Sequence, residues 1–159
     1  MACPSPVSKF AAPTMAVLFP PPLHMVVMTR FLDFNAVKRR PRPNSCLVAP
    51  EGFCPTGLTD EIAPVIPVPP KALFERLCTY AQTQSLWQDQ ATDETTLQFR
   101  CVARTRLMRF ADDVDIQVLP APQPDHSTLA IFSRSRVGYS DLGTNARRVG
   151  TILAHLTSK

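Results

Sequence analysis

"TTLQFRCVARTR", residues 95–106, and "DDVDIQVLP", residues 112–120, decide the fold of this chain because each alternates apolar with polar side chains. Successive side chains of a β-strand point to opposite faces of the sheet, so residues of one parity share a face. Phe99 in the first stretch and Val114 in the second therefore mark an apolar face. We predict two antiparallel strands joined by a turn near Met108.

Three further segments carry strand patterns, and turn-forming or polar residues bound each of them. These segments are residues 61–70, 85–90 and 127–138. The first contains Pro64 and Pro67, which cannot donate hydrogen bonds to a neighbouring strand. We therefore place that segment at an edge of the sheet.

Two segments carry the periodicity of amphipathic helices. Residues 69–84 repeat apolar side chains at helical spacing behind Pro70, a residue suited to a first helical turn. A closing helix begins near Asp141 or Thr144, either of which can cap free amides. Its apolar stripe consists of Val149, Ile152, Leu153 and Leu156. The predicted fold is α+β, a five-stranded mainly antiparallel sheet with two helices on one face, in the order β-α-β-β-β-β-α.

The prolines divide the chain into a leader and a folded domain. Fourteen of the 17 prolines precede residue 71, and those of the leader interrupt apolar stretches well short of the ~20 residues that cross a bilayer. We predict a Pro-rich disordered leader over residues 1–40 and a single α+β domain over residues 41–159. Residues 44–57, "NSCLVAPEGFCPTG", are predicted to form a loop.

The charge balance favours an anionic partner. The formal net charge is +4, which promotes contact with acidic molecules. No aromatic-rich basic motif of the RNA-binding kind is present, so we do not expect nucleic acid as a partner. The basic segment 38–43, "KRRPRP", is interpreted as a solvated linker or as a point of peripheral membrane contact. Oligomeric state and localisation stay open, the latter between cytoplasm, export and membrane association.

The five cysteines include no CxxC pair. Cys46 and Cys54 lie close together in the predicted loop, where a disulfide would require an oxidising compartment. Whether these two thiols are bonded is left open.

The predicted sheet has one face that the two helices do not cover, and strand alternation places charged side chains on it. These are Arg100, Arg104, Arg106, Asp113, Asp115, Arg134 and Arg136. In one interpretation they form a solvated cross-strand ladder, with Arg104 opposite Asp113. In the other, the excess arginines and the apolar Val102 and Phe132 line a site for a small anion or an acidic amphiphile.

The stretch "SRSRVGYSDLGTNARRV", residues 133–149, also allows two interpretations. As a structural corner, it uses Ser140 and Asp141 to satisfy turn amides, while Asn145 ties the helix back to the strand. As a site, the free amides at the start of the helix would hold an anion with help from Arg136 and Arg148.

Patterns for catalysis and for metal binding are weaker. Ser135, Asp141 and His155 are the residue types of a nucleophilic triad, but no "GxSxG" turn accompanies them. The histidines and cysteines lack zinc-ligand spacing. We therefore expect no metal and no cofactor. The enzymatic alternative is a hydrolase or metal-assisted enzyme that uses the region of Asp112, Asp113 and Asp141.

Two stretches resemble a known family. "RTRLMRFADDVDIQV", residues 104–118, followed by "SRSRVGYSDLGTNARRV" is similar to the domain of unknown function 1499 family of bacteria and plastid-bearing eukaryotes. Upstream, "RPRPNSC" is similar to the Pro-Asn-Cys stretch that often opens this family. The resemblance covers about residues 40–156 and implies almost nothing about activity. The motif positions that it carries over are Asp112, Asp113, Ser135, Arg136, Gly138, Tyr139, Ser140, Asp141, Gly143, Asn145 and Arg148.

These observations favour a non-enzymatic binding or scaffold module for a small anionic or amphiphilic ligand. A structural domain that docks another protein on its open sheet face is a further alternative. The candidate ligand-binding residues are Arg104, Arg106, Asp113, Arg134, Arg136, Tyr139, Asp141, Asn145 and Arg148.

Overall fold

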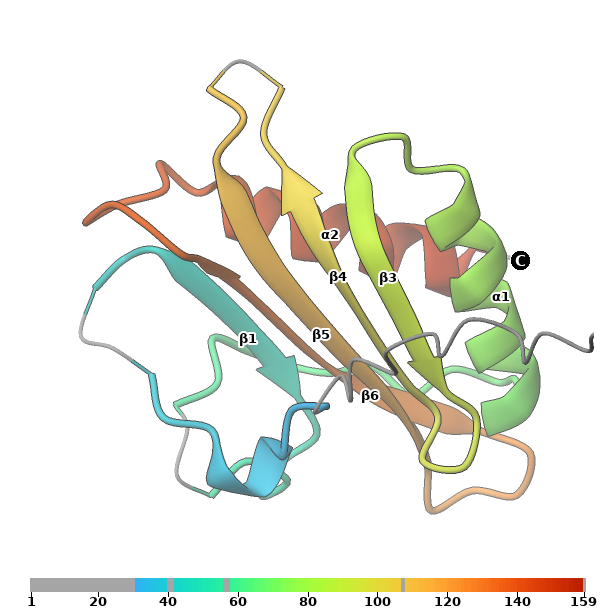
Figure 1. Cartoon of the computed structure of the whole chain (residues 1–159). Coiled ribbons are helices and arrows are strands. Elements are labelled where there is room, and N and C mark those ends of the chain that lie inside the picture. The colour runs from blue at the N-terminus through green and yellow to red at the C-terminus, as the bar shows by residue number, and fades with distance from the viewer. Residues whose placement is uncertain (1–30, 40–41, 56–57, 107, 159) are drawn as a thin grey trace, which may run out of the picture.

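The protein is an α+β sheet with two helices, in a computed structural model that describes residues 31–39, 42–55, 58–106 and 108–158. A six-stranded sheet has the order β2-β1-β6-β5-β4-β3 (Figure 1). The strands are β1 (Ser45–Ala49), β2 (Glu61–Ile62), β3 (Trp87–Asp93), β4 (Gln98–Arg104), β5 (Ala111–Pro120) and β6 (Ser127–Ser135). Neighbouring strands are antiparallel except for β1 and β2, which are parallel.

The two helices, α1 (Pro70–Gln82) and α2 (Thr144–Thr157), both cover one face of the sheet (Figure 1). Their apolar stripes bury Leu73, Leu77, Ile152 and Leu156 against the sheet. The strand residues that meet them are those of one parity, as the alternation predicts, including Phe99, Cys101, Val114, Ile116, Leu129 and Ile131.

The sequence prediction missed one strand. β1 lies inside residues 44–57, which we predicted to form a loop, so the sheet has six strands rather than five. Its run of Cys46, Leu47, Val48 and Ala49 is buried throughout and shows no alternation, because apolar layers cover both sides of this strand. A short apolar run bounded by proline and glycine does not distinguish such a strand from a loop or a buried turn.

The register between β4 and β5 differs from the predicted one. Arg104 pairs with Ala111 rather than Asp113, and Arg100 pairs with Asp115. The reason is the turn, which is closed by a hydrogen bond from the backbone N–H of Thr105 to the carbonyl of Phe110. Arg104 is therefore not the partner of Asp113, which pairs with Arg134 and Arg136 instead.

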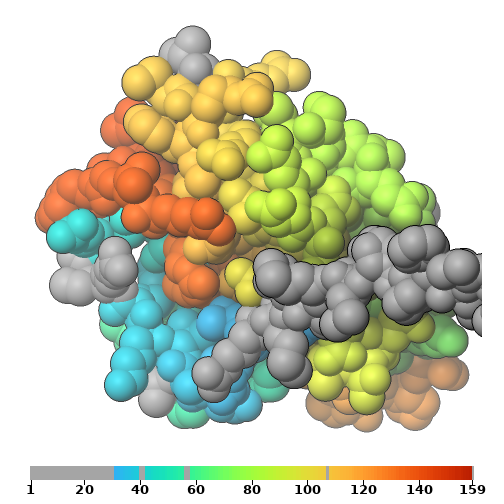
Figure 2. Space-filling model, viewed as in Figure 1, coloured from blue at the N-terminus to red at the C-terminus, as the bar shows by residue number. Residues whose placement is uncertain are grey.

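The sheet face away from the helices is partly covered, although we predicted it to be open. Residues 31–39, with the 3₁₀ helix η1 (Phe34–Ala36), lie on this side of the sheet (Figure 2, blue). Phe34 and Val37 are buried against an apolar cluster of this face that also contains Leu47, Ala49, Cys54, Ala130 and Phe132. Apolar side chains on the second face of β1 and β6 require this cover.

The predicted leader therefore falls into two parts. Residues 1–30 lie outside the described residues, whereas residues 31–39 pack on the sheet. Within the described ranges, neither α1 nor α2 has the length and hydropathy of a membrane-spanning helix. Cys46 and Cys54 are both buried free thiols, and they belong to apolar clusters on opposite faces of the sheet.

Candidate functional site

A buried polar network joins the start of α2 to the sheet, and Asn145 is its centre. The two hydrogens of Asn145 Nδ2 are shared among three acceptors: the Asn44 carbonyl at 3.1 Å, Ser135 Oγ at 3.0 Å and the carboxylate of Asp141. Its Oδ1 accepts a hydrogen bond from Ser133 Oγ at 2.6 Å. Asn145 is fully buried, so these bonds satisfy groups that water cannot reach. The network fixes α2 to β6 and to the segment before β1.

Arg148 extends this network to β5. Its Nη1 donates to Ser133 Oγ at 2.9 Å and to Asn145 Oδ1 at 2.8 Å, and its Nη2 contacts Asp112 Oδ2 at 2.7 Å. Asp112 is almost completely buried, and its other oxygen, Oδ1, has no hydrogen-bond donor within the described residues. Arg148 is therefore the group that neutralises the Asp112 carboxylate.

Asp141 caps α2 and occupies the position that we had considered for an external anion. Its Oδ1 accepts from the backbone N–H of Gly143 at 3.0 Å, and its Oδ2 accepts from that of Asn145 at 2.8 Å. These amides are consequently not free for a ligand. Arg136, one of the two arginines proposed for that site, pairs instead with Asp113 at 2.8 Å.

An arginine–aspartate ladder, made of Arg100, Arg134, Arg136, Asp113 and Asp115, lies on the sheet face away from α1 and α2. Arg134 stands between the two aspartates, 3.7 Å from Asp113 and 3.5 Å from Asp115. Arg100 approaches Asp115 at 3.9 Å, and Arg136 binds Asp113. Each aspartate thus has two cationic neighbours, which is the cross-strand interpretation of these charges.

Burial dominates the electrostatics of Asp115. It raises the pKa of this carboxyl group, although Arg134 and Arg100 both act to lower it. Arg134 also packs over the ring of Phe132, with 5.0 Å between its guanidinium carbon and the ring centroid. A cavity of about 370 Å³ beside the ladder is lined by Lys38, Asp113, Arg134 and Arg136, and its two arginines already face the Asp113 carboxylate.

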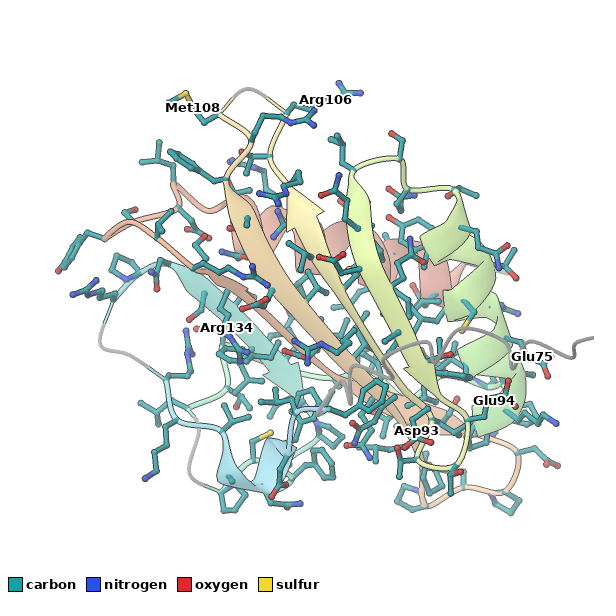
Figure 3. All side chains as sticks on the ribbon, in the orientation of Figure 1. Glu75, Asp93, Glu94, Arg106, Met108 and Arg134 are labelled. Atoms are coloured by element: carbon teal, nitrogen blue, oxygen red, sulfur yellow. The ribbon has the colours of Figure 1, made fainter. Side chains whose placement is uncertain are left out.

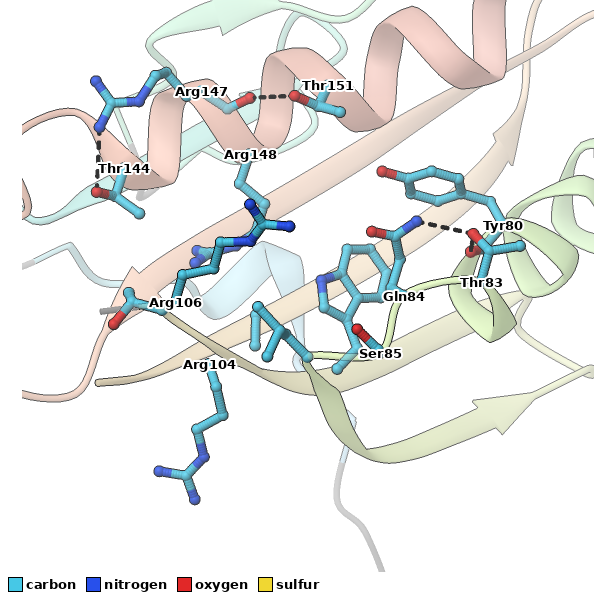
Figure 4. A pocket seen from close by; sticks show the side chains of 14 residues that line it. Tyr80, Thr83, Gln84, Ser85, Arg104, Arg106, Thr144, Arg147, Arg148 and Thr151 are labelled. Carbon is cyan, nitrogen blue, oxygen red and sulfur yellow. Dashed lines mark hydrogen bonds between the residues drawn. The ribbon is translucent and has the colours of Figure 1, made fainter. Parts of the chain in front are cut away.

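A larger cavity, which we call the arginine pocket, lies on the helix side, between α2, the end of β4 and the connection from α1 to β3. Its volume is about 730 Å³. Four arginines line it, namely Arg104, Arg106, Arg147 and Arg148, together with the aromatic Tyr80 and Trp87. Figure 4 shows the side chains of Arg106 and Arg148 extending into the same space, while Arg104 points away from them.

The arginine pocket has no carboxylate among its lining residues. In the described part of the chain, Arg106 makes no hydrogen bond or ion pair, and the Arg147 guanidinium bonds only Thr144 Oγ1, at 3.4 Å. The Arg104 guanidinium bonds neutral groups, Gln88 Oε1 and the Arg109 carbonyl. The pocket therefore carries excess positive charge, which suits a carboxylate or phosphate.

Residues 37–156 match the model of the family described as "Protein of unknown function (DUF1499)". The chain belongs to the DUF1499 family. No curated protein matches it. Five of the eleven residues by which this sequence resembles DUF1499, namely Asp112, Ser135, Asp141, Asn145 and Arg148, bond one another in the buried network. The packing of α2 on the sheet therefore accounts for this part of the DUF1499 resemblance.

The structure divides the candidate ligand-binding residues of this DUF1499 chain into four groups. Arg104, Arg106 and Arg148 line the arginine pocket, Asp113, Arg134 and Arg136 belong to the ladder, Asp141 and Asn145 belong to the buried network, and Tyr139 is exposed. Arg106 was expected on the same face as Arg100. It lies on the helix side because β4 ends at Arg104, where strand alternation stops.

Sequence reasoning missed Arg147, Tyr80 and Trp87 as lining residues of one pocket. Tyr80 lies on α1 and packs against the apolar core, and its ring also meets Trp87 edge-on, with 5.6 Å between centroids. The only sequence signal for Arg147 was its position directly before Arg148 in the first turns of the predicted helix.

The groups considered for catalysis do not assemble. Ser135 and Asp141 both bond Asn145 at the start of α2. His155 lies near the other end of that helix, where its ring stacks on Tyr80. Asp112 and Asp113 lie on opposite faces of the sheet, as neighbours on β5 must. In the described ranges, no three His, Cys, Asp or Glu residues are grouped to hold a metal ion.

Proposed function

We propose that this protein is a binding module for a small acidic ligand, a carboxylate or a phosphate, which it holds in the arginine pocket. The observation that carries this proposal is the set of arginines without carboxylates in one cavity, with Arg106 unpartnered within the described residues. Guanidinium groups without an anion retain their capacity for bidentate hydrogen bonds, the geometry in which arginine binds carboxylates and phosphates.

The walls of the arginine pocket suit such a ligand in two further respects. Hydroxyl groups of Ser85 and Thr144 also line the pocket and supply neutral donors. The rings of Tyr80 and Trp87 supply an apolar wall against which the remainder of a ligand can pack. Charge provides affinity for the acidic group, and the aromatic wall provides contact area.

The chain carries a direct reporter for this proposal, because Trp87 is its only tryptophan. Titration with methyl phosphate or acetate, followed by tryptophan fluorescence, is expected to show saturable binding. Arg106→Ala and Arg147→Ala should each weaken it by about tenfold, since each removes a charge-assisted hydrogen bond. Arg42→Ala is the matched control, because Arg42 is an exposed arginine outside the pocket.

Two results would contradict the proposal. The first is the absence of saturable binding for both methyl phosphate and acetate. The second is binding that Arg106→Ala, Arg147→Ala and Arg42→Ala weaken equally, because this would indicate a general effect of net charge rather than a pocket.

A further inference from the structure

An apolar groove opens beside the arginine pocket, between the turn that joins β4 to β5 and the segment that joins β6 to α2. Its volume is about 580 Å³, and its apolar lining consists of Met108, Phe110, Val137 and Leu142. These side chains are far from buried: Leu142 is 83% exposed and Met108 is 63% exposed. Figure 3 shows Met108 and Arg106 at the same end of the molecule.

The groove and the arginine pocket are adjacent parts of one surface. Thr105, Thr144 and Arg147 line both of them. Asp112 and Arg148 also connect the two, because Asp112 lines the groove, Arg148 lines the pocket, and the two side chains form an ion pair at 2.7 Å. A molecule with its acidic group among the arginines can therefore extend directly into the groove.

Charge favours an acidic occupant at this end of the molecule. The groove adjoins the arginine pocket, and Arg147 lines both cavities. The acidic side chains that line the groove already have partners: Arg148 pairs with Asp112, and the backbone N–H groups of Gly143 and Asn145 donate to Asp141. Exposed apolar side chains beside unpaired cations are complementary to an apolar chain that carries an anionic head.

We propose that the groove binds the apolar chain of an acidic amphiphile whose anionic group occupies the arginine pocket. This inference rests on the proposed function and narrows its ligand class from any small anion to a monomeric amphiphile, such as an alkyl phosphate or a fatty acid. The alkyl chain of the ligand would cover Phe110, Val137 and Leu142, which are otherwise in contact with water.

The length of the alkyl chain tests the inference. Methyl, butyl and octyl phosphate, each below its micelle concentration, are titrated against the full chain with Trp87 fluorescence as the readout. Because each fully buried CH₂ contributes roughly fourfold in affinity and this groove is open on one side, we expect octyl phosphate to bind about tenfold or more tightly than methyl phosphate. Equal affinity of the three probes would overturn the inference.

Substitutions on the rim separate the groove from general hydrophobicity. Leu142→Ser should reduce the gain from methyl to octyl phosphate and leave methyl phosphate binding unchanged. Leu58→Ser is a close control, because Leu58 is 84% exposed and lies outside both cavities. If both variants keep the full gain in affinity from methyl to octyl phosphate, the alkyl chain does not contact Leu142 and the inference is overturned. If both variants lose that gain, the effect is not specific to the groove and the inference is overturned as well.

The design also distinguishes failure of this inference from failure of the proposed function. If methyl phosphate binds in an Arg106-dependent manner and chain length has no effect, the proposed function stands and the groove assignment falls. If octyl phosphate binds independently of Arg106 and Arg147, the anion site is wrong. If the protein binds vesicles of phosphatidylcholine and phosphatidylglycerol but no monomeric alkyl phosphate, the surface contacts a bilayer and the amphiphile proposal is overturned.

Discussion

The ladder and the arginine pocket use the same residue type to different ends. On the sheet face away from the helices, Arg100, Arg134 and Arg136 each lie within 4 Å of Asp113 or Asp115, so that every guanidinium of the ladder has a carboxylate partner. On the helix side, four arginines line one cavity whose lining contains no carboxylate. Of these four, Arg148 pairs with Asp112, which lies outside the lining of that cavity. Partner placement, rather than the number of arginines, distinguishes a structural surface from a candidate binding site.

The largest effect that this comparison predicts concerns Arg148, which belongs to both the network and the pocket. Arg148→Met should lower the free energy of unfolding by about 3–5 kcal/mol, because removing one partner of a buried ion pair leaves an uncompensated charge. The remaining charge is that of Asp112, whose second oxygen already lacks a donor within the described residues. Urea denaturation measures the change.

Arg106→Met is the matched control for this variant. Arg106 is exposed and makes no contact with a carboxylate among the described residues, so its substitution should change the free energy of unfolding by no more than about 0.5 kcal/mol. Equal destabilisation by the two variants would remove the distinction between an arginine that supports the fold and one available to a ligand.

The next effect tests whether Asp141 is a helix cap rather than part of an anion site. Asp141→Ala should lower the free energy of unfolding by about 1–2 kcal/mol, since the backbone N–H groups of Gly143 and Asn145 lose their acceptor. Glu75→Ala, on the exposed side of α1, provides a control for loss of an exposed carboxylate. If Asp141→Ala is as stable as that control, the capping role is wrong.

Strand alternation was sufficient to predict the helix-covered face of the sheet. Phe99 and Val114 both lie there, because their neighbours are polar and burial of one face fixes the parity. The same alternation also placed Arg100 and Arg134 correctly on the other face. Periodicity reports a face reliably wherever the two sides of a strand differ.

The missed features depend on contacts between distant segments. β1 was predicted as a loop because it is buried on both sides and has no alternation, and the register of Arg104 depended on a turn hydrogen bond that no periodicity reveals. The arginine pocket combines α1, β3, β4 and α2. Its composition follows from packing, so the sequence indicated single members such as Arg148 but not the whole set.

A smaller, pH-dependent effect tests the ladder. Because burial raises the pKa of Asp115 above the ordinary carboxyl value of 3.8, the native state favours its neutral form. Its contribution to stability is present below that ordinary value and is lost as the pH rises through the raised native pKa. As the pH rises above about 4, the wild type should therefore lose stability relative to Asp115→Asn, which cannot titrate.

Urea denaturation of both proteins across this pH range measures the difference. The opposite slope, in which the wild type gains stability over Asp115→Asn as the pH rises, would mean that Arg134 and Arg100 outweigh the desolvation of the carboxylate. The long contacts of 3.5 and 3.9 Å from these arginines to Asp115 are the reason to expect desolvation to prevail.

The smallest effect is expected at the exposed end of the ladder. Arg136 donates to Asp113 Oδ1 from both Nε and Nη2, at 3.0 and 2.8 Å, but its side chain is 47% exposed. Arg136→Gln should therefore lower the free energy of unfolding by only about 0.2–1 kcal/mol, since solvent screens surface ion pairs. The loss should shrink further in about 1 M salt, where the Debye length is roughly 3 Å. A loss as large as that of Arg148→Met, or one that salt leaves unchanged, would show that the ladder is a buried charge network like the one around Asp112.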